Sequence, residues 1–406
     1  MKIVKGGVTR ALGFLANGVR AGIKESGNKD LALLYSEAPA IAAGAFTTNR
    51  FQASPVKVSK IHLKNKTHQA VIVNSGNANC ANGKTGDKFA GLMTDYVAKA
   101  TGLDKKEVLV ASTGVIGQAL PIAKIEKAIP GLVSGLSEKG SGVFAKTIMT
   151  TDTVKKEMAV KIRLGESIVT IGGTAKGVGM LYPEMKPERH ATLLVFIATD
   201  ADISKRMLEE ALSESIAGSF NMISVDGDMS TNDSCFILAN GLAGNRKIEK
   251  KGSDYRKFAE GLKFLTRELA KKLARDGEGA TKFIEIEVSG AKTEKDASTI
   301  ARKISTSNLL KCAIFGEDPN WGRICAAAGA AGVEFDPDNV DIYLGGIKAL
   351  SDGAIAKDYS KEKARKFFKA KDVYVKVNLK GGKGKATAWT CDFSKEYIAI
   401  NSEYNT

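Results

Sequence analysis

The strongest constraint on the fold is a long amphipathic helix that is followed closely by an alternating strand. One stripe of apolar residues recurs at helical spacing, at Tyr255, Phe258, Leu262, Leu265, Leu269 and Leu273. This spacing predicts a helix over 255–275 with one buried face. The segment FIEIEVSG (283–290) then alternates apolar and polar residues, which predicts a half-buried strand. Together the two segments predict a mixed α/β protein.

The rest of the chain of 406 residues repeats this mixture. Strands are predicted at 31–37, 68–76, 107–113 and 193–198, and helices at 89–101 and 203–220. Residues 373–393 predict two alternating strands around a Gly/Lys turn, which is the pattern of a hairpin. No stretch approaches about 18 consecutive apolar residues, so we predict no membrane span. The N-terminal segment lacks the features of a signal peptide.

The charge balance is unusually basic, with 60 Lys and Arg against 45 Asp and Glu and a net charge of +15. Such a balance permits binding to nucleic acid, to an anionic membrane or to a small acidic substrate. The cations are spread over many helix and turn positions, and no finger or RNA-binding signature accompanies them. A solvated basic surface is therefore the favoured interpretation. The alternative, a nucleic-acid binder, predicts steeply salt-dependent binding.

Cysteine and histidine restrict the chemistry further. The five Cys residues are scattered without a CxxC pair, which argues against zinc and disulfides and favours a reducing, cytoplasmic compartment. The three His residues (62, 68 and 190) form no helical i, i+4 pair, so we predict no metal site. The segment DGDMSTND (226–233) lacks the Gly and Glu of a calcium loop. We expect no metal and no resident cofactor.

One segment carries more direct chemical information. Residues 172–204 contain a Gly-rich turn with Lys176, a polar loop and a continuous apolar run, and Thr192 stands at the start of that run after Ala191. A Thr nucleophile needs a base, and His is scarce. Self-cleavage before Thr192 would free an α-amino group with a pKa of about 8 that could serve as the base. From this segment alone, a β-branched residue that begins a strand is the simpler interpretation.

Eight blocks, in order along nearly the whole chain, resemble the ornithine acetyltransferase family of arginine biosynthesis. Some members of that family also make N-acetylglutamate from acetyl-CoA. The blocks are NSGNANCANG (74–83), STGVIG (112–117), IMTTDT (148–153), AKGVGM (175–180), FNMISVDGDMSTND (220–233), DGEGATK (276–282), DPNWGRI (318–324) and CDFSKEYIAINSEYNT (391–406).

The resemblance implies a layered helix–sheet–sheet–helix sandwich of the N-terminal-nucleophile type, with a smaller C-terminal α/β part. It implies self-cleavage between Ala191 and Thr192 into an α chain (1–191) and a β chain (192–406), assembled as two α and two β chains. The implied reaction moves acetyl from N2-acetylornithine to glutamate through acetyl-Thr192. Acetyl-CoA as a further donor stays open, and so does a paralogous activity on another N-acylated amino acid.

The resemblance also assigns roles to individual residues. Thr113 and Gly114 correspond to the oxyanion-stabilising pair, as an acyl transfer requires. The implied substrate-binding residues are Thr150, Lys176, Thr192, Glu278, Asn401 and Thr406. Lys176 would pair with a substrate carboxylate and Glu278 with the cationic amine of ornithine.

This sequence departs from the family at one place. Five extra residues, Lys186 to His190, precede Ala191. Self-cleavage depends on a strained peptide bond, so a longer loop is expected to affect the efficiency of cleavage. The alternative is that the five extra residues form a surface bulge that has no effect on catalysis.

Overall fold

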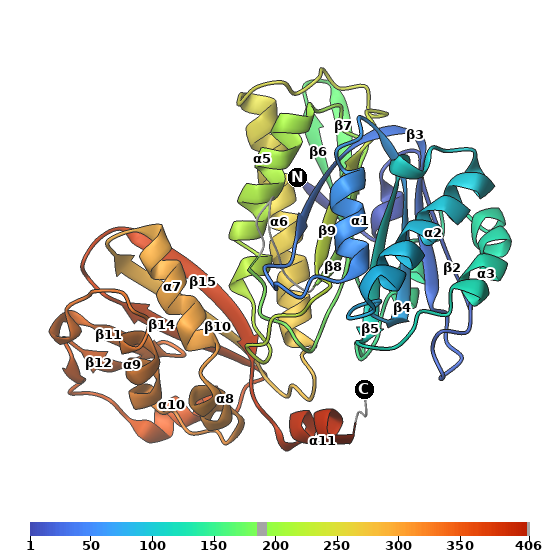
Figure 1. Cartoon of the computed structure of the whole chain (residues 1–406). Coiled ribbons are helices and arrows are strands. Elements are labelled where there is room, and N and C mark those ends of the chain that lie inside the picture. The colour runs from blue at the N-terminus through green and yellow to red at the C-terminus, as the bar shows by residue number, and fades with distance from the viewer. Residues whose placement is uncertain (185–192, 404–406) are drawn as a thin grey trace.

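The computed structural model describes residues 1–184 and 193–403 (Figure 1). A larger unit is built on a nine-stranded sheet, and a smaller unit on a sheet of six strands. The strands of the larger unit are β1 (Lys2–Val4), β2 (Phe14–Val19), β3 (Leu31–Phe46), β4 (His68–Asn77), β5 (Val108–Val115), β6 (Lys156–Leu164), β7 (Ser167–Lys176), β8 (Leu194–Thr199) and β9 (Ser234–Ala239).

The nine strands form two layers because β3 belongs to both. Its first part, Leu31–Tyr35, pairs with β4, and its second part, Ile41–Phe46, pairs with β9. The register shifts between Tyr35 and Ala40, where the strand passes from one layer to the other. The strand order is β1-β6-β7-β8-β9-β3-β4-β5, with β2 also paired to β3.

Helices cover the outer faces of both layers. The helices of the larger unit are α1 (Ser54–His62), α2 (Gly83–Thr101), α3 (Ile122–Ser134), α4 (Ser141–Thr147), α5 (Lys205–Ala217) and α6 (Ser253–Arg275). In Figure 1, α2 and α3 lie beside β2, β4 and β5, while α5 and α6 lie beside β6 to β9. Short 3-10 turns occur at Val8–Arg10, Lys105–Glu107, Phe220–Met222 and Pro337–Asn339.

The alternation of side chains along β8 shows how the layers pack. Leu194 and Phe196 face a core shared with Val71 and Val73 of β4, so this core lies between the two sheets. Val195, the residue between them, faces the opposite way, into the core that contains the apolar stripe of α6. This confirms the predicted helix–sheet–sheet–helix sandwich.

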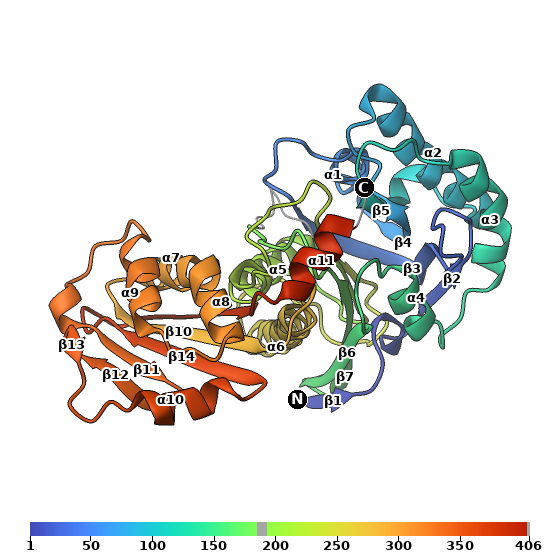
Figure 2. The same cartoon turned by 90° about the horizontal axis from the view of Figure 1, so that it is seen from below.

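The smaller unit has helices α7 (Glu294–Ser305), α8 (Asn308–Phe315), α9 (Trp321–Gly329) and α10 (Lys361–Phe368). Its strands are β10 (Phe283–Ala291), β11 (Asp341–Leu344), β12 (Ile347–Ser351), β13 (Ala354–Ile355), β14 (Asp372–Asn378) and β15 (Gly384–Cys391). They lie in the order β13-β12-β11-β14-β10-β15. The last helix, α11 (Lys395–Glu403), leaves this unit and extends toward the end of the larger unit near β5 (Figures 1 and 2).

The predicted C-terminal hairpin was wrong. Strands β14 and β15 do not pair with each other, because β10 lies between them, parallel to β14 and antiparallel to β15. Strands two places apart in a sheet are separated by about 10 Å, a distance that residues 379–383 can span. Alternation along a strand shows which face is buried, but it does not identify the neighbouring strand.

Other predicted elements are confirmed, with shifts at their ends. All six apolar stripe residues of α6 are buried. The helix predicted at 203–220 is α5, which is shorter, and Ile203 forms a bridge with Ile248 instead. The strand predicted at 31–37 continues to Phe46. Within the described part of the chain, no helix is both long and apolar enough to cross a membrane.

Candidate active site

Lys176 connects the two layers of the sandwich at one end. It is the last residue of β7, and its side chain is only 8% exposed. Its Nζ donates to Thr150 Oγ1 at 2.8 Å and to Thr113 Oγ1 at 3.1 Å. Thr113 lies in β5 of the opposite layer, and Thr150 lies in the loop between α4 and β6. The structure thus brings together three of the predicted site residues from three separate elements.

Opposing effects act on the pKa of Lys176. Burial lowers its pKa from the usual value, and the negative charge of Asp152, whose Oδ2 is 4.0 Å from Nζ, opposes this effect. The neighbouring charge of Lys156 lowers the pKa further, whereas Asp233 and Glu278 raise it. Lys176 therefore loses its proton more readily than a solvated lysine does.

Glu278 and Asn401 meet at a different part of the site. Glu278 lies in the loop between α6 and β10, and its backbone N–H donates to the carbonyl oxygen of Val178 at 2.9 Å. Asn401 of α11 donates from Nδ2 to Glu278 Oε2 at 3.1 Å. A Cβ atom on Gly179 would lie 2.4 Å from Glu278 Cδ, so the absence of a side chain there makes room for the carboxylate.

These groups surround one cavity of about 200 Å³. Its lining residues are Thr113, Gly114, Ile116, Thr150, Thr151, Gly179, Met180, Ser230, Asn232, Glu278 and Asn401. Lys176 lies behind this lining and contacts two of its threonines. The predicted residues that the structure describes thus converge on a single cavity.

Gly114 allows the backbone of β5 to approach this cavity closely. Its φ is +132°, a conformation that side-chain-bearing residues rarely adopt. A Cβ atom here would lie 2.2 Å from the carbonyl carbon of Gly76 in β4. A glycine is therefore required at this position by both the backbone angle and the neighbouring strand.

The strand predicted to follow the nucleophile begins at the same end of the sandwich. Leu194 pairs with Lys176 of β7 and with Ser234 of β9, and the carbonyl of Leu193 accepts from the N–H of Ser234 at 2.7 Å. Thr192, Ala191 and the insertion 186–190 lie outside the described residues, and so does Thr406.

Three buried charged groups beside this cavity were not predicted from the sequence. Asp152 and Lys156 form an ion pair of 2.6 Å with side chains that are 0% and 1% exposed. Asp233 is 1% exposed, and its Oδ1 has no hydrogen-bond partner among the described residues. Burial raises the pKa of Asp233 well above its usual value, although the charge of Lys176 opposes this. Asp152 and Asp233 stand within recognised blocks, but only tertiary structure shows that they are buried.

Asp226 has a scaffold role beside the cavity. Its carboxylate accepts from the backbone N–H groups of Met180 at 2.5 Å and Leu181 at 2.9 Å. These contacts hold the turn that follows β7 and carries Gly179 and Met180 to the cavity.

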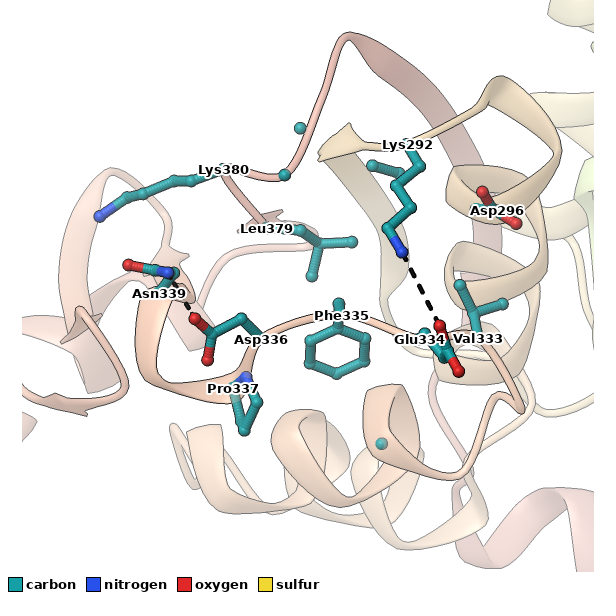
Figure 3. A pocket seen from close by; sticks show the side chains of 14 residues that line it. Lys292, Asp296, Val333, Glu334, Phe335, Asp336, Pro337, Asn339, Leu379 and Lys380 are labelled. Atoms are coloured by element: carbon teal, nitrogen blue, oxygen red, sulfur yellow. Dashed lines mark hydrogen bonds and ion pairs between the residues drawn. The ribbon is translucent and has the colours of Figure 1, made fainter.

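A second hollow, of about 690 Å³, lies in the smaller unit (Figure 3). The charged groups at its rim already have partners. Lys292 Nζ is 3.8 Å from Glu334 Oε2, and Asp336 accepts from Asn339 Nδ2 at 2.6 Å. None of the predicted site residues that the structure describes lines this hollow. The cavity beside Lys176 is therefore the candidate active site.

Over residues 1–184 and 193–403, no group of three or more His, Cys, Asp or Glu side chains is arranged to hold a metal ion.

Comparison with known proteins identifies the family. A sequence model described as the ArgJ family matches residues 15–406. The chain belongs to the ArgJ family. This confirms the resemblance inferred from the sequence blocks, and it makes the chain an enzyme of that family.

Individual ArgJ relatives match over the full length. An arginine biosynthesis bifunctional protein ArgJ from Dehalococcoides mccartyi is 47% identical, covering 99% of this chain and 98% of the relative. The protein of the same name from Caldanaerobacter subterraneus is 44% identical, with 100% of both chains covered. A crystal structure of the Bacillus halodurans ArgJ protein is 42% identical with a TM-score of 0.50, covering 52% of this chain and 98% of that one.

Proposed function

We propose that this chain transfers the acetyl group of N2-acetylornithine to glutamate through an acetyl ester of Thr192. The observation that carries the proposal is the single cavity of the candidate active site. Two threonines that contact Lys176, Thr113 and Thr150, line it together with the Glu278–Asn401 pair. The family assignment and the relatives named for arginine biosynthesis support it.

The charges around the cavity suit a substrate that carries both signs. N-acetylornithine has a carboxylate and a cationic side-chain amine. Glu278, at the cavity lining, offers a negative charge for the amine, and Lys176 offers a positive charge near the two threonines. Glutamate, the acceptor, has a second carboxylate in place of that amine. Both substrates would therefore place a carboxylate on the side of Lys176, and they would differ in the group that faces Glu278.

The chemistry requires donors for a developing oxyanion. Thr113 and Gly114 line the cavity, and Gly114 gives the backbone of β5 close access to a reacting carbonyl. In the proposed step, Thr192 Oγ attacks the acetyl carbonyl carbon, and ornithine leaves with a proton on its amine. The amine of glutamate then attacks the ester and regenerates the hydroxyl group of Thr192.

The position of β8 supports Thr192 as the nucleophile. Leu193 is bonded to Thr192 and hydrogen-bonds to Ser234, next to the buried Asp233. Leu193 therefore lies at the end of the sandwich that carries the cavity. Self-cleavage of the Ala191–Thr192 bond would leave an α-amino group on the nucleophile, to act as its base.

Cleavage would not separate the two segments, 1–191 and 192–406. Strand β8 pairs with β7, and β9 pairs with β3, so one sheet includes strands from both segments. The crystallised ArgJ chain, which covers about half of this one, has the length expected for one cleavage product. We propose an assembly of two α and two β chains.

Intact mass and an activity assay test the proposal together. We expect the purified protein to show two masses that correspond to 1–191 and 192–406, and to release ornithine from N-acetylornithine only when glutamate is present. Thr192→Ala should remain a single chain and be inactive. Thr299→Ala, on the surface helix α7 of the smaller unit, is the matched control. A single uncut chain, together with full activity in Thr192→Ala, would overturn the proposal.

Two further assays define the reaction. Glutamate with acetyl-CoA, in the absence of N-acetylornithine, tests a second donor that could load the same residue. Other N-acylated amino acids, offered as donors, test the paralogous activity. The preferred donor is expected to be N2-acetylornithine, because Glu278 provides a partner for its side-chain amine.

A further inference from the structure

A buried chain of three charges lies behind the candidate active site. Lys156 Nζ is 2.6 Å from Asp152 Oδ1 and 2.6 Å from Asp276 Oδ2, and it also donates to the carbonyl of Val154 at 3.1 Å. The three side chains are 1%, 0% and 8% exposed. We call Asp152, Lys156 and Asp276 the charge triad.

One end of the triad holds the side of the cavity that carries Thr150 and Lys176. Asp152 Oδ2 accepts from the backbone N–H of Thr150 at 3.2 Å, and its Oδ1 accepts from the N–H of Gly177 at 3.1 Å. Gly177 directly follows Lys176. The single carboxylate therefore connects the loop of Thr150 to the end of β7, and the charge of Lys176 lies 4.0 Å away.

The other end holds the loop of Glu278. Asp276 caps the end of α6, two residues before Glu278. Its carboxylate accepts from the N–H and hydroxyl of Thr153 and from the N–H of Val154. These contacts join residues 150–156, at one side of the cavity, to the start of the loop that forms the other side.

The triad also crosses the proposed cleavage site in sequence. Asp152 and Lys156 belong to the segment 1–191, whereas Asp276 belongs to 192–406. The opposing charges are buried, so the Coulomb attraction between them is screened less than that of a surface ion pair. No part of the triad lines the cavity, and its effect on substrate must pass through Thr150, Lys176 and Glu278.

We propose that Lys156 is a positioning residue that sets the distance between the Glu278 loop and the Thr150–Lys176 side of the substrate cavity. This inference rests on the proposed function, because the substrate must contact both sides. Loosening the Asp276 end moves Glu278 relative to Thr150, so a substrate that lies between these two lining residues binds less tightly, while the chemistry at the acyl carbon is less affected.

Asp276→Asn is the main test, because it weakens one ion pair and preserves a carbonyl oxygen for Thr153. We expect the KM for N-acetylornithine to rise about tenfold, the equivalent of one weakened charge-assisted hydrogen bond, with kcat changed less than about threefold. Calorimetry with ornithine should show a matching loss of affinity. The control is Asp341→Asn, in the smaller unit, where a carboxylate that is 5% exposed binds Lys348 at 2.9 Å and Lys380 at 2.7 Å. It should lower the Tm without changing KM.

A triple variant, Asp152→Asn with Lys156→Met and Asp276→Asn, separates positioning from stability. A buried ion pair that is replaced by neutral groups often leaves stability unchanged, whereas Lys156→Met alone leaves two carboxylates unpaired. We expect the triple variant to have a higher Tm than Lys156→Met and to retain the raised KM.

The outcomes separate this inference from the proposed function. If the wild-type protein releases no ornithine, the proposed function is overturned. If it does release ornithine, an unchanged KM in Asp276→Asn or a wild-type KM in the triple variant overturns the positioning role of Lys156 alone.

Discussion

Lys176 Nζ donates to Thr150 Oγ1 across 2.8 Å, although the two residues are 26 positions apart and belong to different elements. The same ammonium group donates to Thr113 at 3.1 Å, which is 63 positions away. One buried cation on β7 therefore holds a hydroxyl group of the opposite layer and a hydroxyl group of a loop at the cavity.

Replacing Lys176 with Met should remove both hydrogen bonds and the charge. Hydrogen bonds to a charged group contribute about 1.5 to 3 kcal/mol each, so we expect kcat/KM to fall at least 100-fold. Steady-state kinetics checks this. Lys282→Met removes another buried lysine, which donates to the carbonyl of Phe368 in the smaller unit, and it should leave kcat/KM within about threefold of wild type. Equal kinetic losses in both variants would contradict the role of Lys176.

The activity should depend on pH through Lys176. Burial and the charge of Lys156 lower its pKa, while Asp152, Asp233 and Glu278 oppose the shift without cancelling it. If the charged form binds the substrate, kcat/KM falls as the pH rises through the pKa of Lys176. This pKa lies below that of an ordinary lysine, which is about 10.4. A pH profile measured with N-acetylornithine should show this limb, and Lys176→Arg should move it to higher pH. A profile that is flat up to about pH 10 would contradict the prediction.

Gly179→Ala should displace Glu278 without removing it. The new methyl group would lie 2.4 Å from Glu278 Cδ, so the carboxylate must move. We expect the KM for N-acetylornithine to rise about tenfold, close to the effect of Glu278→Gln, with a change in Tm of only a few degrees. Kinetics and thermal unfolding provide the measurement, and an unchanged KM would show that the position of Glu278 does not determine binding.

Gly114→Ala should reduce both stability and activity. The substitution places Cβ 2.2 Å from the backbone of Gly76 at a φ of +132°, so we expect a loss of about 3 kcal/mol in the free energy of unfolding. Gly131→Ala in α3 is the control, since nothing lies within 4 Å of its Cβ position, and it should stabilise the protein by up to about 1 kcal/mol. Denaturant unfolding measures both, and equal effects in the two variants would contradict the steric argument.

Asp233→Asn should stabilise the protein at neutral pH. Burial raises the folded-state pKa of Asp233 above the unfolded value of about 3.9, so its carboxyl group costs stability as the pH rises above that value. The neutral amide removes this cost, and the gain should be present at pH 7 and absent near pH 3. Thermal unfolding at both values checks the sign. A loss of stability at pH 7 would mean that the ionised carboxylate is favoured by its neighbours, Lys176 included.

The local elements follow from sequence patterns where one face is buried. The stripe of α6 and the alternation of β10 were predicted because helices and strands have different periods, and both were confirmed. The hairpin of β14 and β15 was wrong because the same alternation fits any neighbouring strand. The site residues came from a resemblance of blocks, and six of them converge on one site: Thr113, Gly114, Thr150, Lys176, Glu278 and Asn401.

By itself, the sequence determined the mixed α/β class, the buried faces of α6 and β10, and the family to which the chain belongs. Only the tertiary structure decided that β10 separates β14 from β15, that Lys176 contacts Thr113 and Thr150, and that Lys156 lies between two buried carboxylates. The physical reason is that periodicity reports the environment of a side chain along its own element. The partner of a buried charge is set by how distant elements pack, and that information is absent from local spacing.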